Sequence, residues 1–271
     1  MRDELAPILG ILEPYLADVV LIGGWVPELY RRFGGLSWTE PPSRTTELDV
    51  LVGHTLDPKG RPKLRQLLEA GGLRPARPEP FPADWVRTAD DVTAVEFLMP
   101  RPGPHVTDAI RQVDAQGYLG AIVLDDAEVL RRFTTTLTVA STHRQWTVVV
   151  PTLGAWLAGK VLTYGTRHVP DDAPADDDKR TKDLAYIRDL LHAGPQVYAR
   201  VFDDLRAMAQ DSRGLKILKR TQRVLIRPIE LAVSRAAARL ASRDGGAPAS
   251  ARAEILGALS EVRHLIEDAR S

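Results

Sequence analysis

The sequence predicts an α+β protein with two lobes. Residues 1–150 are expected to form a mixed sheet with flanking helices, and residues 151–271 a helical bundle. Short apolar runs alternate with helix-like patterns in the first half, whereas helix-length patterns dominate after Pro151. The chain has 271 residues, of which 44% are apolar and 27% charged, so it can bury one large core or two modest ones.

In the first half, β-branched runs bounded by glycine and proline predict strands, and apolar residues at helical spacing predict helices. Residues 18–22 form a compact β-branched run that stops at a pair of glycines. Trp25, Leu29 and Phe33 then fall on one face of a helix, and a loop rich in proline and glycine follows at 34–44. The expected helices are 4–16, 25–33 and 62–70, and the expected strands are 18–22, 46–52, 92–98, 118–124, 134–140 and 145–150.

Beyond residue 150 the chain is expected to be helical, with one interruption at 170–178. That stretch contains five aspartates together with proline and alanine, a composition typical of a solvated loop. Asp183 is expected at the start of the next helix. A Gly-Gly-Ala-Pro linker at 245–248 precedes a last helix at 251–269.

The formal net charge of 0 conceals an uneven distribution. Residues 1–150 contain 16 Lys and Arg against 20 Asp and Glu, and residues 151–271 contain 20 against 16. The basic excess is concentrated at 179–243, where 15 basic residues face 6 acidic ones. Such a segment fits a surface that meets a polyanion, and it equally fits a helical bundle with a solvated basic face.

The absence of cysteine excludes disulfides, thiol catalysis and thiolate zinc sites. Acidic residues near the N-terminus, and interruptions at Pro7, Gly10 and Glu13, argue against a secretory signal. No apolar run approaches the roughly 18 residues of a membrane span. We therefore expect a soluble, cytoplasmic protein with no membrane partner.

The glycine pair lies at a predicted strand-to-helix turn. There, the backbone N–H groups of Gly23 and Gly24 are able to approach a phosphate, and the helix N-terminus adds favourable partial positive charge. A tight turn without a ligand accounts for the same two residues.

Three carboxylates lie within predicted strands. On the strand 46–52, Glu47 and Asp49 share one face, while Leu48 and Val50 point into the core. Glu96 is embedded in the apolar strand 92–98. If the two strands are neighbours, the three acids would form a cluster of the kind that holds divalent cations in phosphoryl-transfer sites. Amphipathic strands with a solvated acidic face are the structural alternative.

Lys160 and Asp183 are candidates in the second half. Lys160 lies in the middle of a predicted helix, close to its apolar face, and Asp183 directly follows Lys182. Either Asp183 complements a helix dipole, or the chain returns so that Lys160 and Asp183 point into one cleft.

Taken in chain order, these residues resemble the nucleotidyltransferase (polymerase-β-like) superfamily. A glycine pair, followed after an insert by Thr-x-acid-x-Asp, is similar to the signature of that superfamily. The later lysine and the Lys-Asp pair resemble the AbiEii/MenT-type toxins and related stand-alone nucleotidyltransferases. The resemblance covers residues 19–191 and rests on Gly23, Gly24, Thr45, Glu47, Asp49, Lys160, Lys182 and Asp183.

The resemblance implies transfer of a nucleoside monophosphate from an NTP to a hydroxyl acceptor. Gly23 and Gly24 would hold the triphosphate, and Lys160 would neutralise its oxygens. Asp183 would belong to the catalytic motif of the second lobe. For toxins of this type the implied acceptor is tRNA or another RNA, and the implied partner is a separate antitoxin protein.

The resemblance also implies Mg²⁺ as the cofactor, with Mn²⁺ as an alternative. Glu47 and Asp49 would bind the metal, with Glu96 as the third acid. The chain departs from the family at Glu47, where aspartate is usual. Octahedral magnesium tolerates displaced ligands poorly, so glutamate at position 47 is expected to lower the transferase activity relative to aspartate.

A basic stripe marks a predicted helix near residue 220. Its side chains fall on one helical face, with Leu218 and Leu225 on the opposite face, and Arg235, Arg239 and Arg243 continue the spacing. Phosphate contacts in nucleic-acid complexes come mainly from lysine and arginine. The candidate RNA-binding residues are Lys216, Lys219, Arg220, Arg223 and Arg227.

Two further functions remain open on the sequence. The transferase reaction would also suit a small-molecule or protein acceptor. Alternatively, the chain is a degenerate nucleotidyltransferase fold that binds nucleotide or RNA without turnover, a hypothesis that Glu47 favours.

Overall fold

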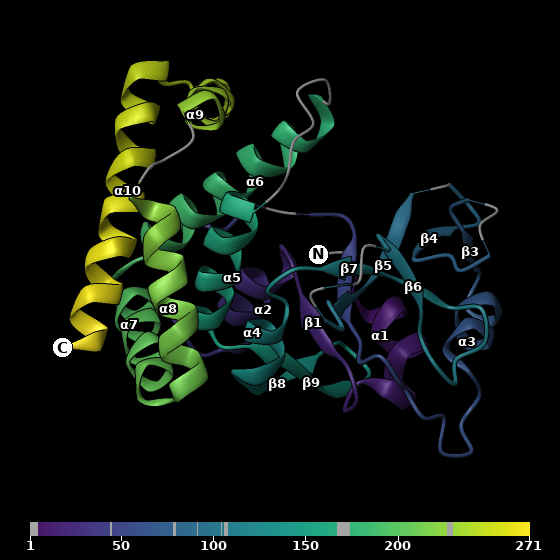
Figure 1. Ribbon diagram of the computed structural model, residues 1–271. Coiled ribbons are helices and arrows are strands. Elements are labelled where there is room, and N and C mark those ends of the chain that lie inside the picture. The colour runs from purple at the N-terminus through teal and green to yellow at the C-terminus, as the bar shows by residue number, and fades with distance from the viewer. Residues whose placement is uncertain are drawn as a thin grey trace. The chain divides into compact units, whose positions relative to one another are not determined.

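The computed structural model describes residues 5–43, 45–77, 80–90, 92–103, 105, 108–166, 174–226 and 230–271, without the side chains of 166, 174–178 and 231. The chain forms two compact units, both drawn in Figure 1. The first unit consists of Met1–Gly35 and Arg44–Pro151, and the second of Leu36–Ser43 and Thr152–Ser271. The boundary between Pro151 and Thr152 lies one residue from the boundary predicted between the two lobes. The assignment of residues 36–43 to the second unit was not predicted.

The first unit contains a seven-stranded mixed sheet, which agrees with the predicted α+β class. Its main path runs β1-β2-β5-β4-β3, and β7 and β6 extend it from β5. The β2–β5 and β5–β7 pairs are parallel, and the other pairs are antiparallel. The strands are β1 (Val20–Ile22), β2 (Leu48–Leu51), β3 (Leu73–Pro75), β4 (Asp84–Arg87), β5 (Thr93–Pro100), β6 (Ile110–Gln112) and β7 (Gly120–Leu124).

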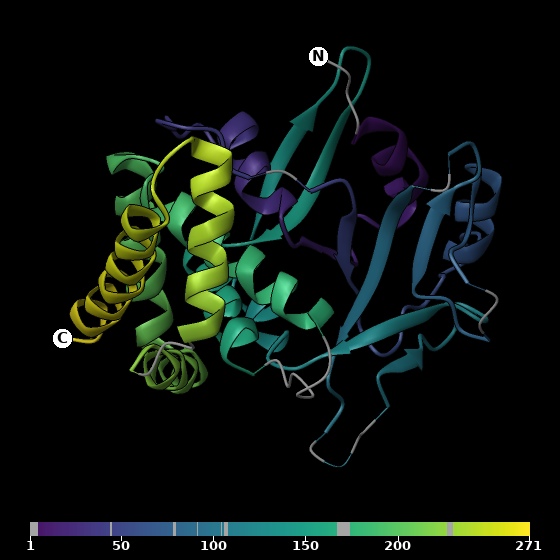
Figure 2. The ribbon, with the colours of Figure 1, turned by 90° about the horizontal axis from the view of Figure 1, so that it is seen from above.

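A separate hairpin of β8 (Thr134–Ala140) and β9 (Gln145–Pro151) completes the strands of this unit and forms a long ribbon (Figure 2). Strand β8 has the predicted bounds. The strands predicted at 18–22, 46–52 and 118–124 are shorter than expected, since they begin at Val20, Leu48 and Gly120. Strands β3, β4 and β6, of three or four residues each, were not predicted.

The helices of the first unit are α1 (Ala6–Leu12), α2 (Trp25–Phe33), α3 (Leu64–Ala70) and α4 (Glu128–Arg132), with a 3₁₀ turn at Glu13–Tyr15. Helix α2 has the predicted bounds. It packs against β1 and β8, and α1 packs against α3. Large side chains such as Trp85, Phe97 and Leu21 are fully buried, which places the core along strands β1, β4 and β5.

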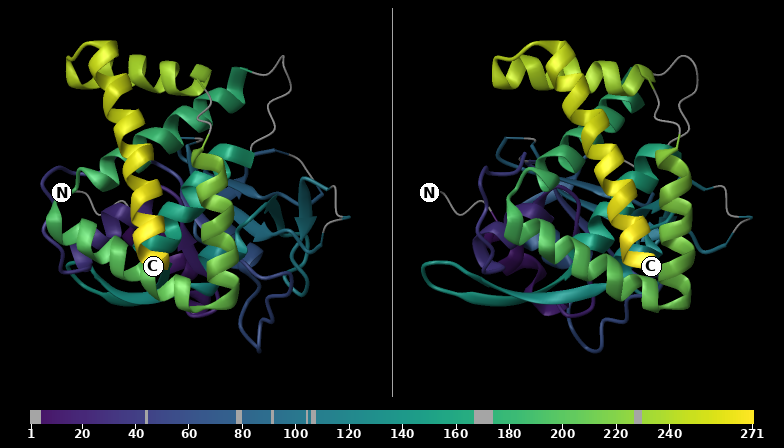
Figure 3. Two further views of the ribbon diagram at one scale, coloured as in Figure 1. Left: turned by 60° about the vertical axis from the view of Figure 1, so that its left-hand side comes forward. Right: turned by 90° about the vertical axis from the view of Figure 1, so that its left-hand side faces the viewer.

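The second unit is a helical bundle. It contains α5 (Leu153–Thr166), α6 (Pro174–Leu191), α7 (Pro195–Gln210), α8 (Ser212–Leu225), α9 (Glu230–Asp244) and α10 (Pro248–Arg270). Helix α5 packs against α6, α7 and α8, and α10 packs against α6, α7, α8 and α9. Figure 3 shows α9 running across the N-terminal end of α10.

The helix α6 corrects two predictions. It begins at Pro174, so residues 174–178 of the predicted acidic loop are helical, and Asp183 lies within the helix rather than at its start. Proline at the first position and acidic residues in the first turn are the sequence pattern of a helix N-terminus. The same composition is typical of a solvated loop, so it does not by itself distinguish a loop from a first helical turn.

Asp204 of α7 fixes the start of α5. Its carboxylate accepts a hydrogen bond from the backbone N–H of Gly154 (3.2 Å) and forms an ion pair with Arg200 (2.9 Å). Burial raises the pKa of Asp204 above its ordinary value, despite the opposing effect of Arg200 and the backbone N–H of Gly154.

In the described part of the chain, no helix combines the length and the apolar character that a membrane span requires.

Candidate functional site

The glycine pair forms the turn between β1 and α2. Gly23 follows the last residue of β1 and adopts a φ of 73°, in the left-handed region that favours glycine. A Cβ atom at this position would lie 1.7 Å from Oδ2 of Asp49. Gly24 is the N-cap residue of α2 and has an ordinary helical conformation. Conformation therefore requires glycine at position 23, where the carboxylate of Asp49 lies directly against the backbone.

Asp49 lies beside Glu96 across a parallel strand pair. The two residues are register partners on β2 and β5, and Asp49 is also the partner of Ile22 on β1. Register partners project from the same face of a sheet. Both carboxylates are half-buried, whereas the alternating residue Val50 is fully buried. The two strands are neighbours, as the prediction of an acidic cluster required.

Glu47 lies in the chain just before β2, which begins at Leu48 rather than at the predicted residue 46. The side chain of Glu47 is half-buried, and its Oε2 accepts a hydrogen bond from the hydroxyl of Thr46 (3.1 Å). Glu47 is two residues from Asp49, as the proposed metal-binding pair requires, although it is not part of the strand.

Asp84 is a further acid at this part of the sheet, and the sequence reasoning missed it. It is the register partner of Glu96 on the antiparallel strand β4. Asp49, Glu96 and Asp84 therefore form a row across three adjacent strands. Oδ1 of Asp84 is buried and has no hydrogen-bond partner among the described residues. The available signal was an acid followed by the apolar residues Trp85 and Val86, as Glu96 is followed by Phe97 and Leu98.

The acidic row does not amount to a complete metal centre. Within the described residues, no group of three acidic or histidine side chains is arranged to hold a metal ion. Magnesium is commonly held by one or two protein carboxylates, with water and substrate phosphates as the remaining ligands. The oxygen donors of Asp49 and Glu96 fit that mode of binding.

Lys160 and Asp183 meet within the helical unit. The ammonium of Lys160 on α5 donates to Oδ1 of Asp183 on α6 over 2.9 Å. Only 3% of the Asp183 side chain and 16% of the Lys160 side chain are exposed. The same ammonium lies 4.9 Å from the ring centre of Tyr186 and 5.9 Å from that of Trp156. The two residues therefore form an ion pair, and the cleft into which one interpretation of the sequence pointed them stays a prediction.

The basic stripe lies on the outer face of α8. Lys216, Lys219, Arg220 and Arg223 are exposed, and Leu218 and Leu225 are buried on the other side, as predicted. Asp211 caps the helix by accepting hydrogen bonds from the backbone N–H groups of residues 213 and 214 (3.0 and 2.9 Å). The fifth stripe residue, Arg227, lies outside the described residues.

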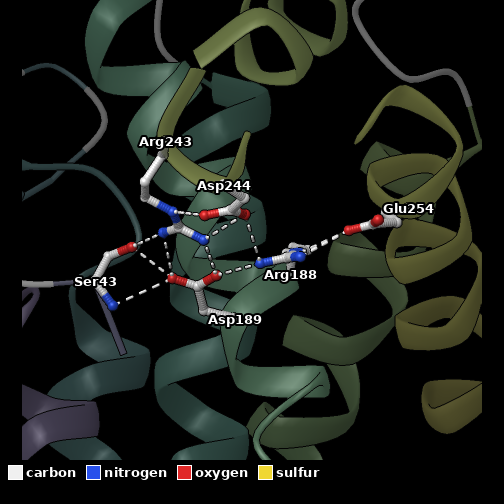
Figure 4. Close-up of polar contacts among 6 residues, drawn as sticks. All are labelled: Ser43, Arg188, Asp189, Arg243, Asp244 and Glu254. Carbon is white, nitrogen blue, oxygen red and sulfur yellow. Dashed lines mark hydrogen bonds and ion pairs between the residues drawn. The ribbon is translucent and has the colours of Figure 1, made fainter. Parts of the chain in front are cut away.

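Arg243, which continued the spacing of the stripe, takes part in an internal charge cluster instead (Figure 4). Its guanidinium donates to Ser43 Oγ (2.8 Å) and to Asp189 (3.2 Å). The hydrogen bond to Asp244 raises the pKa of Arg243 above its ordinary value, which favours the charged form. We define the Asp189 cluster as Ser43, Arg188, Asp189, Arg243, Asp244 and Glu254.

The Asp189 cluster holds residues 36–43 on the helical unit. Asp189 accepts hydrogen bonds from both the backbone N–H (3.2 Å) and the hydroxyl (2.5 Å) of Ser43. Further along, the N–H of Thr39 donates to the carbonyl of Ala193 (2.8 Å). A Cβ atom on Gly194, whose φ is 111°, would lie 2.7 Å from Thr39 Oγ1. Residues 36–43 of the connection between α2 and β2 are thus bound at Thr39 and at Ser43, although the sequence predicted only a loop.

Comparison with protein-family models, curated proteins and solved structures finds no match to this chain.

Proposed function

We propose that this protein is a magnesium-dependent nucleotidyltransferase that transfers a nucleoside monophosphate from an NTP to a hydroxyl acceptor. The observation that carries the proposal is the position of Asp49, which lies against Gly23 on one side and beside Glu96 on the other. This arrangement brings together, in one unit, a turn of the kind that binds phosphate and two carboxylates of the kind that bind metal ions.

The proposed phosphate contacts come from the Gly23–Gly24 turn and the N-terminus of α2. This helix has nine residues, and the N–H of Trp25 is its proposed donor to phosphate oxygens, because Val26 donates to the carbonyl of Gly23 (3.4 Å) and Pro27 has no N–H. Asp49 and Glu96 are the proposed metal ligands, together with Glu47, which lies two residues before Asp49 in the chain. When bound, Mg²⁺ would supply the positive charge that stabilises the transferring phosphate and the leaving pyrophosphate.

Lys160 is the proposed cation for the triphosphate, and Asp183 orients it. An ammonium held between a carboxylate and two aromatic rings has few alternative positions, so little conformational entropy is lost when it contacts a phosphate. This role comes from the resemblance to nucleotidyltransferases, and the fixed geometry of Lys160 within its own unit supports it.

The proposed acceptor is tRNA, and the proposed physiological role is that of a toxin paired with a separate antitoxin. The exposed basic side chains of α8 support an RNA acceptor, because a row of cations on one helix face suits a phosphate backbone. A transferase acting on a small molecule has no need of this surface.

The test is incubation of the purified protein with Mg²⁺, total tRNA and each of the four α-³²P-labelled NTPs. We expect label to reach the RNA, and Asp49→Asn to lower the rate by about 10² or more, as for loss of other charge-stabilising groups. Asp90→Asn, which alters an exposed aspartate paired with Arg87, is the matched control and should retain activity. Absence of transfer to RNA, protein and small hydroxyl acceptors alike would refute the proposal.

Charge reversal on α8 separates the acceptors. Lys219→Glu, Arg220→Glu and Arg223→Glu together should abolish RNA labelling. If the labelled product is a small molecule or a protein, the triple variant should keep its activity, and the tRNA part of the proposal would fail alone.

A non-catalytic nucleotide-binding protein is the second candidate. Glu47 favours it, because it replaces the usual aspartate and its carboxylate accepts a hydrogen bond from Thr46. The candidate predicts that NTP binds, that Asp49→Ala weakens binding, and that no acceptor is labelled. Glu47→Asp should then create or increase transferase activity.

A further inference from the structure

The turn between β6 and β7 presents an exposed aromatic ring. Tyr118 is 64% exposed, more than any other large apolar or aromatic side chain in the described part of the chain. One face of its ring stacks on Phe81, with ring centres 6.4 Å apart and an interplanar angle of 15°. The ring is therefore held in a defined orientation while most of its surface meets solvent.

The backbone of this turn is strained. Ala115, Gly117 and Tyr118 have φ values of 69°, 53° and 42°, and the left-handed region is unfavourable for residues other than glycine. A strained conformation persists only where its surroundings impose it, and such positions are concentrated at functional sites. A tyrosine here opposes both the backbone preference and the usual polarity of an exposed turn.

Gln116 imposes the conformation. Its side chain is fully buried, and its Oε1 accepts a hydrogen bond from the backbone N–H of Leu64 (2.7 Å). Its Nε2 donates to the carbonyl of Leu56 (2.5 Å) and lies 3.3 Å from the hydroxyl of Tyr15. These contacts anchor the turn to three segments of the same unit, so Tyr118 is displayed by a rigid support.

A lysine lies beside this turn. A Cβ atom on Gly117 would lie 3.3 Å from Nζ of Lys63, so this ammonium is adjacent to the residue that precedes Tyr118. The neighbouring basic side chains Arg61 and Arg65 are paired with Asp18 and Glu69. An aromatic face next to a lysine is the combination with which proteins bind single-stranded nucleic acid, the ring stacking on a base and the cation contacting a phosphate.

We propose that Tyr118, supported by Phe81 and flanked by Lys63, stacks on an unpaired base of RNA. The inference deepens the proposed function by naming a contact of the first unit with the RNA acceptor, and it rests on that function for the choice of RNA. A protein partner that buries Tyr118 is the competing occupant. The stacked, strained geometry and the adjacent cation favour the base.

The test is fluorescence anisotropy with a fluorescein-labelled single-stranded RNA of twelve nucleotides, without NTP or Mg²⁺. Tyr118→Ala should weaken binding at least about fivefold, the lower end of the range for loss of one base-stacking ring. Tyr118→Phe should bind as the wild type does, and Tyr118→Leu, which keeps apolar area without a π face, should be weakened. With an abasic strand of the same length, Tyr118→Ala and the wild type should bind equally.

Val92→Ala is the control, because Val92 is also an exposed large apolar residue (36%) but lies outside this turn and outside the basic stripe of α8. It should leave binding unchanged. Circular dichroism should show that all variants are folded, since the altered side chains are mostly in solvent. Wild-type binding by Tyr118→Ala, an undiminished effect of Tyr118→Ala on the abasic strand, or no binding of RNA by the wild type would each overturn the inference.

The outcome is separable from that of the proposed function. In a protein that already carries Asp49→Asn, Tyr118→Ala should lower the RNA affinity by the same factor as it does in the wild type, because binding is measured without the reaction. An inactive protein that keeps this dependence on Tyr118 would retain the base-stacking site and lose only the transferase proposal.

Discussion

The carboxylate of Asp49 occupies the space that a side chain on residue 23 would need, since a Cβ atom there would lie 1.7 Å from Asp49 Oδ2. The two residues belong to segments separated by the whole of α2 and the following connection. Their contact makes the glycine at the turn and the acid on β2 a single structural arrangement.

Gly23→Ala should therefore destabilise the protein by about 2 kcal/mol or more, because it combines a left-handed backbone with a steric clash. Denaturation in urea measures the change. Gly10→Ala is the control: Gly10 lies in α1 and has open space around it, so alanine should stabilise the helix by up to about 1 kcal/mol. Equal effects of the two substitutions would contradict the assigned role of Gly23.

Lys160 and Asp183 should show energetic coupling. Removal of one partner leaves the other charged and largely buried, so Lys160→Met and Asp183→Asn should each cost about 3 kcal/mol. The double variant should cost less than the two single costs combined, by about 1 kcal/mol or more. Urea denaturation of the four proteins tests this cycle, and strict additivity would show that the pair does not contribute as a unit.

Substitution of Asp189 should release residues 36–43. Asp189→Ala removes the acceptor for Ser43 and leaves Arg188 and Arg243 without this partner, at a cost of about 2 kcal/mol. Hydrogen exchange should accelerate at the amides of Thr39 and Ser43. Arg252→Ala breaks an exposed ion pair and should change stability by less than about 1 kcal/mol without altering those amides. Unchanged exchange in Asp189→Ala would exclude the anchoring role.

Asp204 should give the stability a defined dependence on pH. Because burial raises its pKa in the folded state, ionisation disfavours folding, and this cost appears as the pH rises through the interval above the ordinary value of 3.8. Asp204→Asn carries no such cost. The stability of Asp204→Asn relative to the wild type should therefore increase between pH 4.5 and pH 7.5, as measured by thermal denaturation. A relative stability that falls over this interval would contradict the direction of the shift.

The local pattern of the sequence predicted the elements whose own residues determine them. Strand β8 has alternating exposure along a β-branched run, and α2 has apolar residues at helical spacing, so both have the expected bounds. The alternation at Leu48, Asp49 and Val50 was predicted for the same reason. In each case the side-chain period alone specifies which face is buried.

Features that depend on pairing between distant segments were not predictable in this way. Strand β4 has four residues, and only its register with β5 places Asp84 beside Glu96. No local property of β2 or β5 selects its partner strand, so the sequence predicts that Asp49 and Glu96 are neighbours only if the two strands pair. The start of α6 was missed since the acidic run at 176–178 suits both a loop and a first helical turn.

The chain passes from the first unit to the second and back before it enters the second unit a final time. One cut near residue 151 therefore cannot separate two self-sufficient halves. An N-terminal fragment would carry residues 36–43 without Asp189 and Ala193, and a C-terminal fragment would lack the eight residues that cover those acceptors. Independent expression of the helical unit calls for a synthetic peptide of that sequence supplied in trans, or for its fusion ahead of Thr152.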